Sequence, residues 1–568
     1  MTTSLTLSLL LLAPVLTAQQ PATPPQSNQD SGRIAGKVTH QLSGQPIRRA
    51  NVTVQSMPGR SGAGQTGSLG SLSMPPSFTA STEDGGQFSF ENLPAGRYFL
   101  RVERTGFVPT GFGARPGSGN MGGPITLTPG QRLEDLSIKM LPQAVIAGKV
   151  VDEEGEPVLG VQIMALRQGR YRTRGGRAMP MGSHSSNDLG EFRVANLAPG
   201  RYTLSASARR GPFGPRGRAS ARSEAPEEQL VTTYYPGVTD MASAAPIEVT
   251  AGQEVNGILI QLRKARVYRV SGRLSGLGEA ATRSFVNLYP KGRLPMGFMG
   301  GGMAQILPDG SFEIQGVQPG SYHLHVYRGG NGRQAMAARV PVEVAGANVE
   351  GLVIPVGNPL SLTGIVRMEG SEESQNIQGH IGFRPSEGMP MNMPSTAIKA
   401  DGTFVLESVP RDKMHLQVMG LPEGLYVRSA RMGSQNILDK GLDLTLVESA
   451  PPLEIFLSAK SGTVSGAVLN DKEVVPGSMI TLIPEPIRAD RPDLFKTANS
   501  DEQGAFSFKG VAPGEYKLYA WDEMIFDAFF DPEFMKAFAG SGKRVKIQEN
   551  GHERVELTLV KEESAGAQ

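Results

Sequence analysis

The sequence predicts an all-β protein: a string of five antiparallel β-sandwich domains, with a short amphipathic helix inserted in the last. Three observations lead to this prediction. One motif recurs five times, apolar and polar residues alternate within it, and turn-forming residues are abundant. Glycine supplies 71 of the 568 residues and proline 42, while hydrophobic residues stay at 39%. Ordinary hydrophobicity with so many turn residues is typical of many short strands.

The repeated motif runs from an Asp and a nearby glycine, through alternating apolar residues and a Pro-Gly turn, to a tyrosine. Its first copy reads D-G-G-Q-F-S-F-E-N-L-P-A-G-R-Y-F-L. Because Phe88 and Phe90, and then Tyr98 and Leu100, alternate at a period of two, each set lies on one sheet face. We interpret the motif as a tight β-hairpin with an apolar inner face. Its structural anchors, always twelve residues apart, are Gly86 and Tyr98, Gly190 and Tyr202, Gly310 and Tyr322, Gly402 and Met414, and Gly504 and Tyr516.

A second motif, apolar-x-Gly-x-apolar, precedes each copy, with its glycine at Gly36, Gly148, Gly272, Gly364 and Gly466. Each unit closes with an alternating strand, such as residues 136–140. A unit of roughly 100 residues with about seven strands fits a β-sandwich that buries its own core. The predicted segments are 1–18 (signal peptide), 19–31 (Pro-rich linker), 32–142, 143–264, 265–358, 359–460 (degenerate) and 461–562 (sandwiches), and 563–568 (tail).

The combined pattern A-G-K-V, D-x-G-x-F and L-x-P-G-x-Y-x-L resembles the carboxypeptidase regulatory-like domain, a transthyretin-like (prealbumin-like) sandwich. The resemblance spans residues 32–562 and is weakest in the fourth copy. It implies the fold, and because related folds include carbohydrate-binding modules, it also leads us to expect glycan binding. In metallocarboxypeptidases such a domain lies beside a catalytic domain, but none of the seven histidines here begins an H-x-x-E zinc motif.

The N-terminal residues favour export. Residues 5–15 form an apolar run that fits the core of a signal peptide, with cleavage after Ala18; the alternative is a buried N-terminal strand. No other run approaches the 18 apolar residues of a membrane-spanning helix, so we expect no transmembrane span. The predicted localisation is secreted, periplasmic or cell-surface.

Composition and motifs argue against several classes of function. Cysteine is absent, which excludes disulfides, thiolate zinc sites and a cysteine nucleophile. The net charge of +2 provides no field that would recruit nucleic acid. Two G-x-G-x-x-G matches do not open helices with apolar periodicity, and no G-x-S-x-G is present. We therefore expect no enzyme, no cofactor and no metal.

Length variation concentrates in the segments that flank each hairpin, and antiparallel connectivity predicts that both flanking loops leave the same end of the sandwich. In the second domain both loops are rich in arginine. Together they would offer ten guanidinium groups to an acidic partner, such as an anionic polysaccharide; the alternative is a solvated Arg/Gly loop. The candidate residues are Arg167, Arg170, Arg172, Arg174, Arg177, Arg209, Arg210, Arg216, Arg218 and Arg222.

An insertion in the last domain reads W-D-E-M-I-F-D-A-F-F-D-P-E-F-M-K-A-F. Pro532 can open a helix at its first turn, and Phe530, Phe534 and Phe538 then repeat on one face. With Trp521, these rings form either an aromatic platform for a ligand or a helix that caps the open end of the sandwich.

Methionine and histidine supply two weaker candidates. Thioethers in the loops could hold Cu(I), although flexible apolar loops are the alternative; these methionines are Met296, Met299, Met303, Met389, Met391 and Met393. His323 and His325 share the strand face opposite Tyr322 and Leu324, so we expect both to point outward as surface residues, with a metal pair as the alternative.

Taken together, these features predict an exported, non-catalytic multidomain binding protein of the cell envelope or exterior, with carbohydrate as the expected ligand class. Two alternatives remain open. The chain could be a structural or adhesive spacer rod that mediates protein–protein contact, or an accessory subunit of a separate peptidase or transport system.

Overall fold

The computed structural model describes most of the chain. The predicted signal peptide, all but Ser31 of the linker, and the tail lie outside the described part. The described residues are 31–56, 76–114, 122–123, 125–168, 178–208, 227–276, 283–291, 301–330, 333–357, 359–370, 377–386, 393–447, 449–501, 503–522 and 528–560.

The described strands form sheets that pair face to face around apolar clusters. In the first sandwich a sheet in the order β4-β1-β8 packs on a sheet in the order β3-β2-β5-β6, with β7 beside β5. Ile34, Phe90 and Leu100 are buried between them. The strands are β1 (Gly32–His40), β2 (Asn51–Ser56), β3 (Ser77–Ser81), β4 (Gln87–Leu93), β5 (Gly96–Glu103), β6 (Thr110–Gly111), β7 (Ile125–Leu127) and β8 (Arg132–Met140).

The second and third sandwiches repeat this plan, each with its own buried cluster. The second contains β9 (Ala144–Val151), β10 (Val161–Gln168), β11 (Ala178–Ser185), β12 (Glu191–Leu197), β13 (Gly200–Ala208), β15 (Thr233–Tyr234), β16 (Ile247–Val249) and β17 (Glu254–Gln261). The third contains β18 (Lys264–Ser275), β19 (Phe285–Pro290), β20 (Met303–Gln305), β21 (Ser311–Val317), β22 (Gly320–Gly330), β23 (Arg333–Val344) and β24 (Val349–Pro355). Strand β14 (Glu227–Leu230) precedes β15 in the chain but pairs with β18.

The fourth and fifth sandwiches follow, again with separate clusters. The fourth contains β25 (Leu360–Met368), β26 (His380–Pro385), β27 (Ser395–Ala397), β28 (Thr403–Val409), β29 (Lys413–Met419), β30 (Tyr426–Met432), β31 (Gln435–Asn436), α1 (Ile437–Lys440), β32 (Leu442–Asp443) and β33 (Leu453–Ser458). The fifth contains β34 (Gly462–Asn470), β35 (Glu473–Val474), β36 (Met479–Pro484), β37 (Lys496–Asn499), β38 (Ala505–Val511), β39 (Gly514–Trp521), α2 (Pro532–Lys536), β40 (Lys543–Ile547) and β41 (His552–Thr558).

The all-β sandwich class predicted from the sequence is confirmed, but the repeated motif is not a hairpin. Strand β4 pairs with β1 in one sheet, whereas β5 pairs with β2 in the other. The Pro-Ala-Gly turn therefore carries the chain across the core, and the other copies do the same. We call this connection between the two sheets an arch. Alternating apolar residues fit an arch as well as a hairpin, because both strands face the same core. The domain boundaries stay a prediction.

Two groups of glycines explain the spacing of the motifs. Gly86 has φ +77°, and its carbonyl accepts a hydrogen bond of 2.8 Å from the Val38 N–H; the equivalent glycines have φ between +71° and +83°. Gly36 instead lies against β8, which pairs in parallel with β1. A Cβ there would lie 2.2 Å from the Leu136 carbonyl oxygen, so no larger residue fits. A parallel pair of this kind recurs in all five sandwiches, and the sequence did not predict it.

The tyrosine of each motif locks the arch. The Tyr98 hydroxyl donates to the Pro94 carbonyl at 2.6 Å, and the other three motif tyrosines make the same contact four residues upstream. Met414 has no hydroxyl and fills the same buried position. Four of the five motifs therefore end in a ring that is packed in the core and tied to the turn before it.

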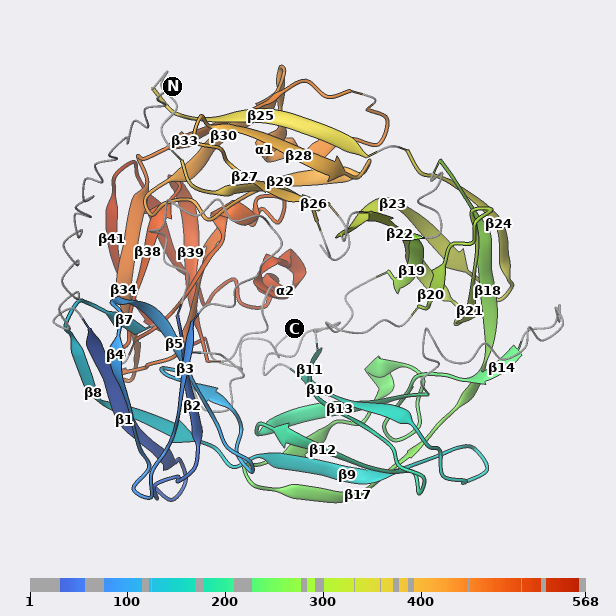
Figure 1. Cartoon of the computed structure of the whole chain (residues 1–568), viewed down its shortest axis with the longest axis horizontal. Helices are drawn as coiled ribbons and strands as arrows, with labels where there is room; N and C mark the ends of the chain where they lie inside the picture. The colour runs from blue at the N-terminus through green and yellow to red at the C-terminus, as the bar shows by residue number, and fades with distance from the viewer. Residues whose placement is uncertain are drawn as a thin grey trace, which may run out of the picture.

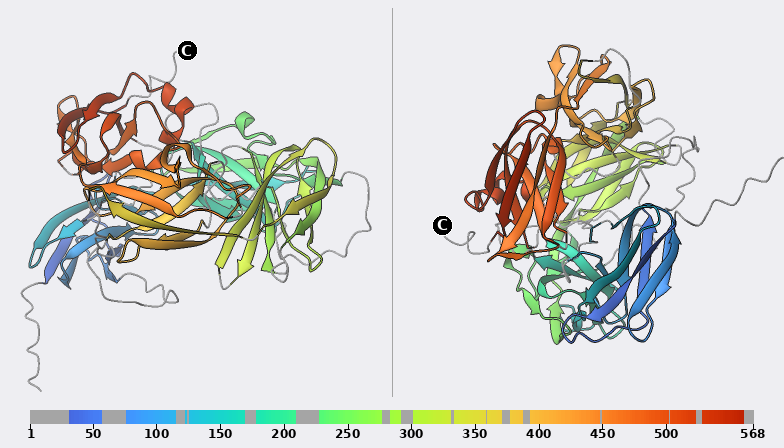
Figure 2. Two further views of the ribbon diagram at one scale, coloured as in Figure 1. Left: turned by 90° about the horizontal axis from the view of Figure 1, so that it is seen from above. Right: turned by 90° about the vertical axis from the view of Figure 1, so that its left-hand side faces the viewer.

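The sandwiches do not form the straight rod that was one expectation. Figure 1 shows them following one another around a ring-like curve in this view, with α2 on its inner side. The side views show that the curve is not flat, because the last sandwich lies above the first (Figure 2). Among the described residues, no helix has the length and apolar character needed to cross a membrane.

Candidate functional site

The two arginine-rich loops of the second sandwich leave opposite ends of one sheet. The chain leaves β10 at Gln168, which lies opposite both Ala178 of β11 and Arg201 of β13. It leaves β13 at Ala208, which lies opposite Val161 at the far end of β10. The prediction that both loops share one end is therefore wrong. The reason is that β11 stands between the first loop and the arch and reverses the chain once more.

Arg167 is the one candidate arginine within the described part of the chain. Its side chain is buried, and its Nη2 donates to the Pro199 carbonyl at 2.9 Å, beside the arch turn. This contact supports the turn, and it leaves the guanidinium group of Arg167 buried and not available to a ligand in solvent. The other nine lie outside the described residues, so their role stays a prediction: Arg170, Arg172, Arg174, Arg177, Arg209, Arg210, Arg216, Arg218 and Arg222.

The predicted aromatic platform is closed, which corrects that prediction. Trp521 is 0% exposed, and its Nε1 donates to Thr481 Oγ1 at 2.8 Å. The Phe538 ring meets the Trp521 ring edge-on, with centroids 5.2 Å apart. Phe534 is also buried, and Phe530 is partly buried against the same cluster. The rings contact one another, so their faces are unavailable to a ligand.

The predicted amphipathic helix is present, but it covers a sheet face and not the open end of the sandwich. Asp531 caps α2, accepting from the Glu533 N–H at 3.0 Å, and Pro532 opens it. Trp521 belongs to the apolar cluster of α2, whereas Leu518 and Ala520 of the same strand belong to the core between the sheets. Alternation along β39 therefore places α2 on the outer side of that sheet.

His325 differs from the outward-facing surface residue that was expected. It is 4% exposed, and its ring lies 4.8 Å from that of Tyr289. Within the described residues, neither of its ring nitrogens has a hydrogen-bond partner. Burial, together with the positive charge of Arg339, lowers the pKa of His325 to about 4. The described residues contain no group of three or more His, Asp or Glu side chains placed to hold a metal ion.

The predicted methionine sites fall mainly outside the described residues. Met303 and Met393 are described and partly buried. Met296, Met299, Met389 and Met391 lie outside, so copper binding stays a prediction.

Ion pairs join the later sandwiches. Arg339 of the third sandwich contacts Asp412 of the fourth at 2.9 Å, with side chains 10% and 14% exposed. Arg491 of the fifth sandwich contacts Asp439 of the fourth at 2.8 Å and its own neighbour Asp493 at 2.7 Å. The Arg339–Asp412 pair is largely desolvated and therefore depends on both partners, whereas Asp439 is 41% exposed. Residue spacing alone did not reveal these contacts, because the partners lie far apart in the chain.

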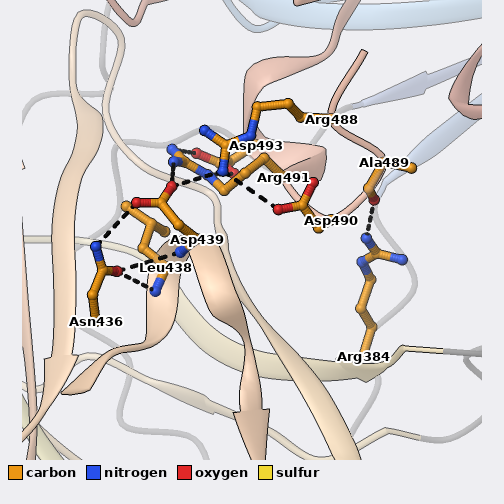
Figure 3. A network of polar contacts seen from close by, with 9 residues as sticks. All are labelled: Arg384, Asn436, Leu438, Asp439, Arg488, Ala489, Asp490, Arg491 and Asp493. Carbon is orange, nitrogen blue, oxygen red and sulfur yellow. Dashed lines mark hydrogen bonds and ion pairs between the residues drawn. The ribbon is translucent and has the colours of Figure 1, made fainter. Parts of the chain in front are cut away.

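Figure 3 shows how the junction between the fourth and fifth sandwiches is organised. Asn436 caps α1, and Asp439 in that helix accepts from both Arg488 and Arg491 at 2.8 Å. Burial alone would raise the pKa of Asp439, but these hydrogen bonds outweigh it and hold the pKa below its usual range. Arg384 reaches across the same junction to the Ala489 carbonyl. The network therefore fixes the two sandwiches against each other.

Two concave regions stand out. A pocket of about 320 Å³ lies at this same junction, beside Arg428 and Tyr516. A larger groove of about 570 Å³ lies on the outer face of the sheet β12-β9-β17 in the second sandwich. Its lining residues are Ala147, Gly148, Lys149, His184, Asn187, Glu191, Phe192, Arg193, Asn256, Gly257, Ile258 and Leu259.

Comparison with known proteins supports the family resemblance. Residues 33–140 and 145–212 match the carboxypeptidase regulatory-like domain, which covers the first sandwich and most of the second. The resemblance predicted from the motifs is confirmed for these two segments. No curated protein matches the chain.

Several solved structures share local similarity. The Bacillus anthracis TIE protein is 11% identical, with 70% of this chain and 68% of that chain covered and a TM-score of 0.16. GBS52, the minor pilin of Streptococcus agalactiae, is 13% identical, with 41% and 97% covered and a TM-score of 0.21. BcpA, the major pilin subunit of Bacillus cereus, is 8% identical, with 73% and 99% covered and a TM-score of 0.13. Similarity at these scores carries no argument about function.

Proposed function

We propose that this protein is an exported, non-catalytic scaffold of five carboxypeptidase regulatory-like sandwiches that binds a component of the cell envelope or exterior. The observation that carries the proposal is the set of defined contacts between consecutive sandwiches. Flexible strings of independent modules need no such contacts, whereas a protein with a structural or adhesive role benefits from a fixed shape.

A different kind of contact joins the consecutive sandwiches at successive junctions. The first pair shares a small apolar cluster of Val108, Leu141 and Ala198. Strand β14 pairs with β18 between the second and third. The ion pairs of Asp412 and Asp439 hold the remaining junctions. Removing one partner of the largely buried Arg339–Asp412 pair should cost about 3–5 kcal/mol, which is enough to favour one orientation strongly, whereas the pair at the 41% exposed Asp439 contributes less.

Binding to the envelope tests this function. Purified full chain would be titrated onto whole cells and onto envelope fractions of the producing organism, and the bound amount measured against concentration. We expect saturable binding without any change in the covalent structure of the envelope polymers. Absence of binding, or hydrolysis of a peptide or glycan by the pure protein, would contradict the proposal.

Carbohydrate is the ligand class we propose for this scaffold. The observation that favours it is the groove of the second sandwich, which combines exposed hydrogen-bonding side chains with an exposed apolar side chain, Leu259. Sugars present hydroxyl groups and apolar C–H surfaces together, so a site of mixed character suits them. Titration of the full chain with a panel of soluble polysaccharides measures this directly.

A further inference from the structure

The groove on the second sandwich is formed by three neighbouring strands. Ala147 and Gly148 of the central strand β9 provide a low floor, because neither carries a large side chain. One wall comes from β12. The other comes from β17, whose register shifts between Val255 and Ile258. Asn256 and Gly257 together lie opposite the single residue Ala147 and form a bulge, and such bulges often re-aim side chains at binding sites.

The backbone of the groove floor is already engaged. Strand β9 pairs with β12 on one side and with β17 on the other. An extended peptide adds to a sheet through free backbone groups at an edge, and the centre of this sheet offers none. A ligand here must therefore be recognised by side chains, which favours a polyhydroxylated chain over a peptide strand.

The outward-facing side chains of the three strands form two rows across this face. Glu191, Lys149 and Leu259 occupy one row, since Lys149 lies opposite each of the others. Arg193 lies opposite Ala147 in the next row, beside the bulge. The Lys149–Glu191 contact is 3.6 Å, and Arg193 reaches Glu254 at 3.5 Å, all with side chains about half exposed.

Exposed ion pairs of this kind contribute little stability and exchange readily. Lys149 and Arg193 can therefore turn to a ligand carboxylate, and the exposed ring of His184 lies in the same groove. Glu191 is the only carboxylate among the lining residues. The lining thus carries an excess of cationic groups over acidic ones.

We propose that this groove binds an acidic polysaccharide, with Arg193 and Lys149 holding the carboxylates of uronic acid units. Asn256 lines the groove and can hydrogen-bond hydroxyl groups, and Leu259, 53% exposed, offers an apolar surface to a sugar ring. The inference rests on the proposed function and specifies its ligand and residues.

The equivalent bulges in neighbouring sandwiches carry acids. In the first sandwich the two residues of the bulge are Glu134 and Asp135, and in the third they are Glu350 and Gly351. Carboxylates at that position repel an acidic glycan, whereas Asn256 does not. Of these three sandwiches, the second is therefore the one suited to an acidic glycan, and the third supplies a matched control. Arg273 follows the motif glycine there, as Lys149 does in the second, and pairs with Asp309 at 3.4 Å.

The experiment is calorimetric titration of the full chain with an oligogalacturonide and with a neutral dextran oligomer, at low and high salt. We expect the wild type to prefer the oligogalacturonide and to lose affinity in salt. Arg193→Ala with Lys149→Ala should weaken binding about tenfold or more, because charge-assisted hydrogen bonds are lost. Arg273→Ala should bind as the wild type does.

The outcomes separate this inference from the broader function. Unchanged affinity in the Arg193→Ala, Lys149→Ala variant, or equal affinity for dextran, would overturn the inference even if the chain binds envelope fractions. Failure of the wild type to bind either glycan or any envelope fraction would overturn the proposed function as well. Because both substituted side chains are about half exposed, circular dichroism should show an unchanged fold.

Discussion

The buried His325 makes the third sandwich sensitive to acid. Its pKa falls from an ordinary 6.5 to about 4, because burial and the cationic Arg339 disfavour the imidazolium form. Tyr289, Tyr327 and His323 surround the ring and supply no carboxylate. The folded chain therefore binds a proton here less readily than the unfolded chain.

The size and direction of the effect follow from this difference. A group whose pKa is lowered by folding contributes its full stability above its unfolded pKa and loses it as the pH falls through the folded pKa. The window thus runs from about pH 6.5 down to about pH 4. Each pKa unit corresponds to 1.36 kcal/mol, so the loss attributable to His325 approaches about 3 kcal/mol at pH 4.

A substitution isolates this contribution from that of other groups. His325→Phe retains an aromatic ring of similar size and cannot be protonated. Differential scanning calorimetry of both proteins from pH 8 to pH 4 should show the variant gaining stability over the wild type as the pH falls. His380→Phe, at an exposed histidine, is the matched control for replacing an imidazole by a phenyl ring. A constant difference between His325→Phe and wild type across the whole range would refute the reasoning.

Three further substitutions test the fold and its junctions. Asp439→Ala should weaken the association of the last two sandwiches by about 1–3 kcal/mol and increase the radius of gyration measured by small-angle scattering. Glu454→Ala removes an ion pair within the fourth sandwich and should leave the radius of gyration unchanged. Gly148→Ala places a Cβ 1.8 Å from a carbonyl oxygen of β17 and should lower the free energy of unfolding by about 1–3 kcal/mol. The control Gly540→Ala places its Cβ in open space and should cause no such loss. Tyr202→Phe removes the hydroxyl bond to the arch and should cost about 1 kcal/mol in thermal unfolding.

Local periodicity predicted the class of fold but not the pairing of strands. Alternating apolar residues around Phe88 and Tyr98 report which side of a strand is buried. They cannot report whether two successive strands pair or lie in opposite sheets, because both arrangements bury the same side chains. The arch and the parallel pair of β1 with β8 therefore emerged only from the structure.

The wrong predictions about candidate sites have two causes. The sequence of β11 lacks the alternation typical of strands, so it does not indicate that the chain reverses direction once more before the arch. Without that reversal, both arginine-rich loops are predicted at the same end of the sandwich. From the spacing of their own segments, His325 is predicted to be accessible, and one of the two interpretations of the insertion makes Trp521 accessible as well. Their burial depends on side chains from other strands and from α2, which local spacing does not describe.

The placement of the loops limits where a ligand can bind. In the first two sandwiches the second strand and the strand after the arch end at opposite ends of one sheet, and the long loops follow from those ends. A site built within one of these sandwiches must therefore use one end or a sheet face. The sheet face has an advantage, since strands on both sides hold its side chains in fixed register. The groove around Ala147 meets this condition, and this is why we assign the ligand to the face of the second sandwich and not to its arginine-rich loops.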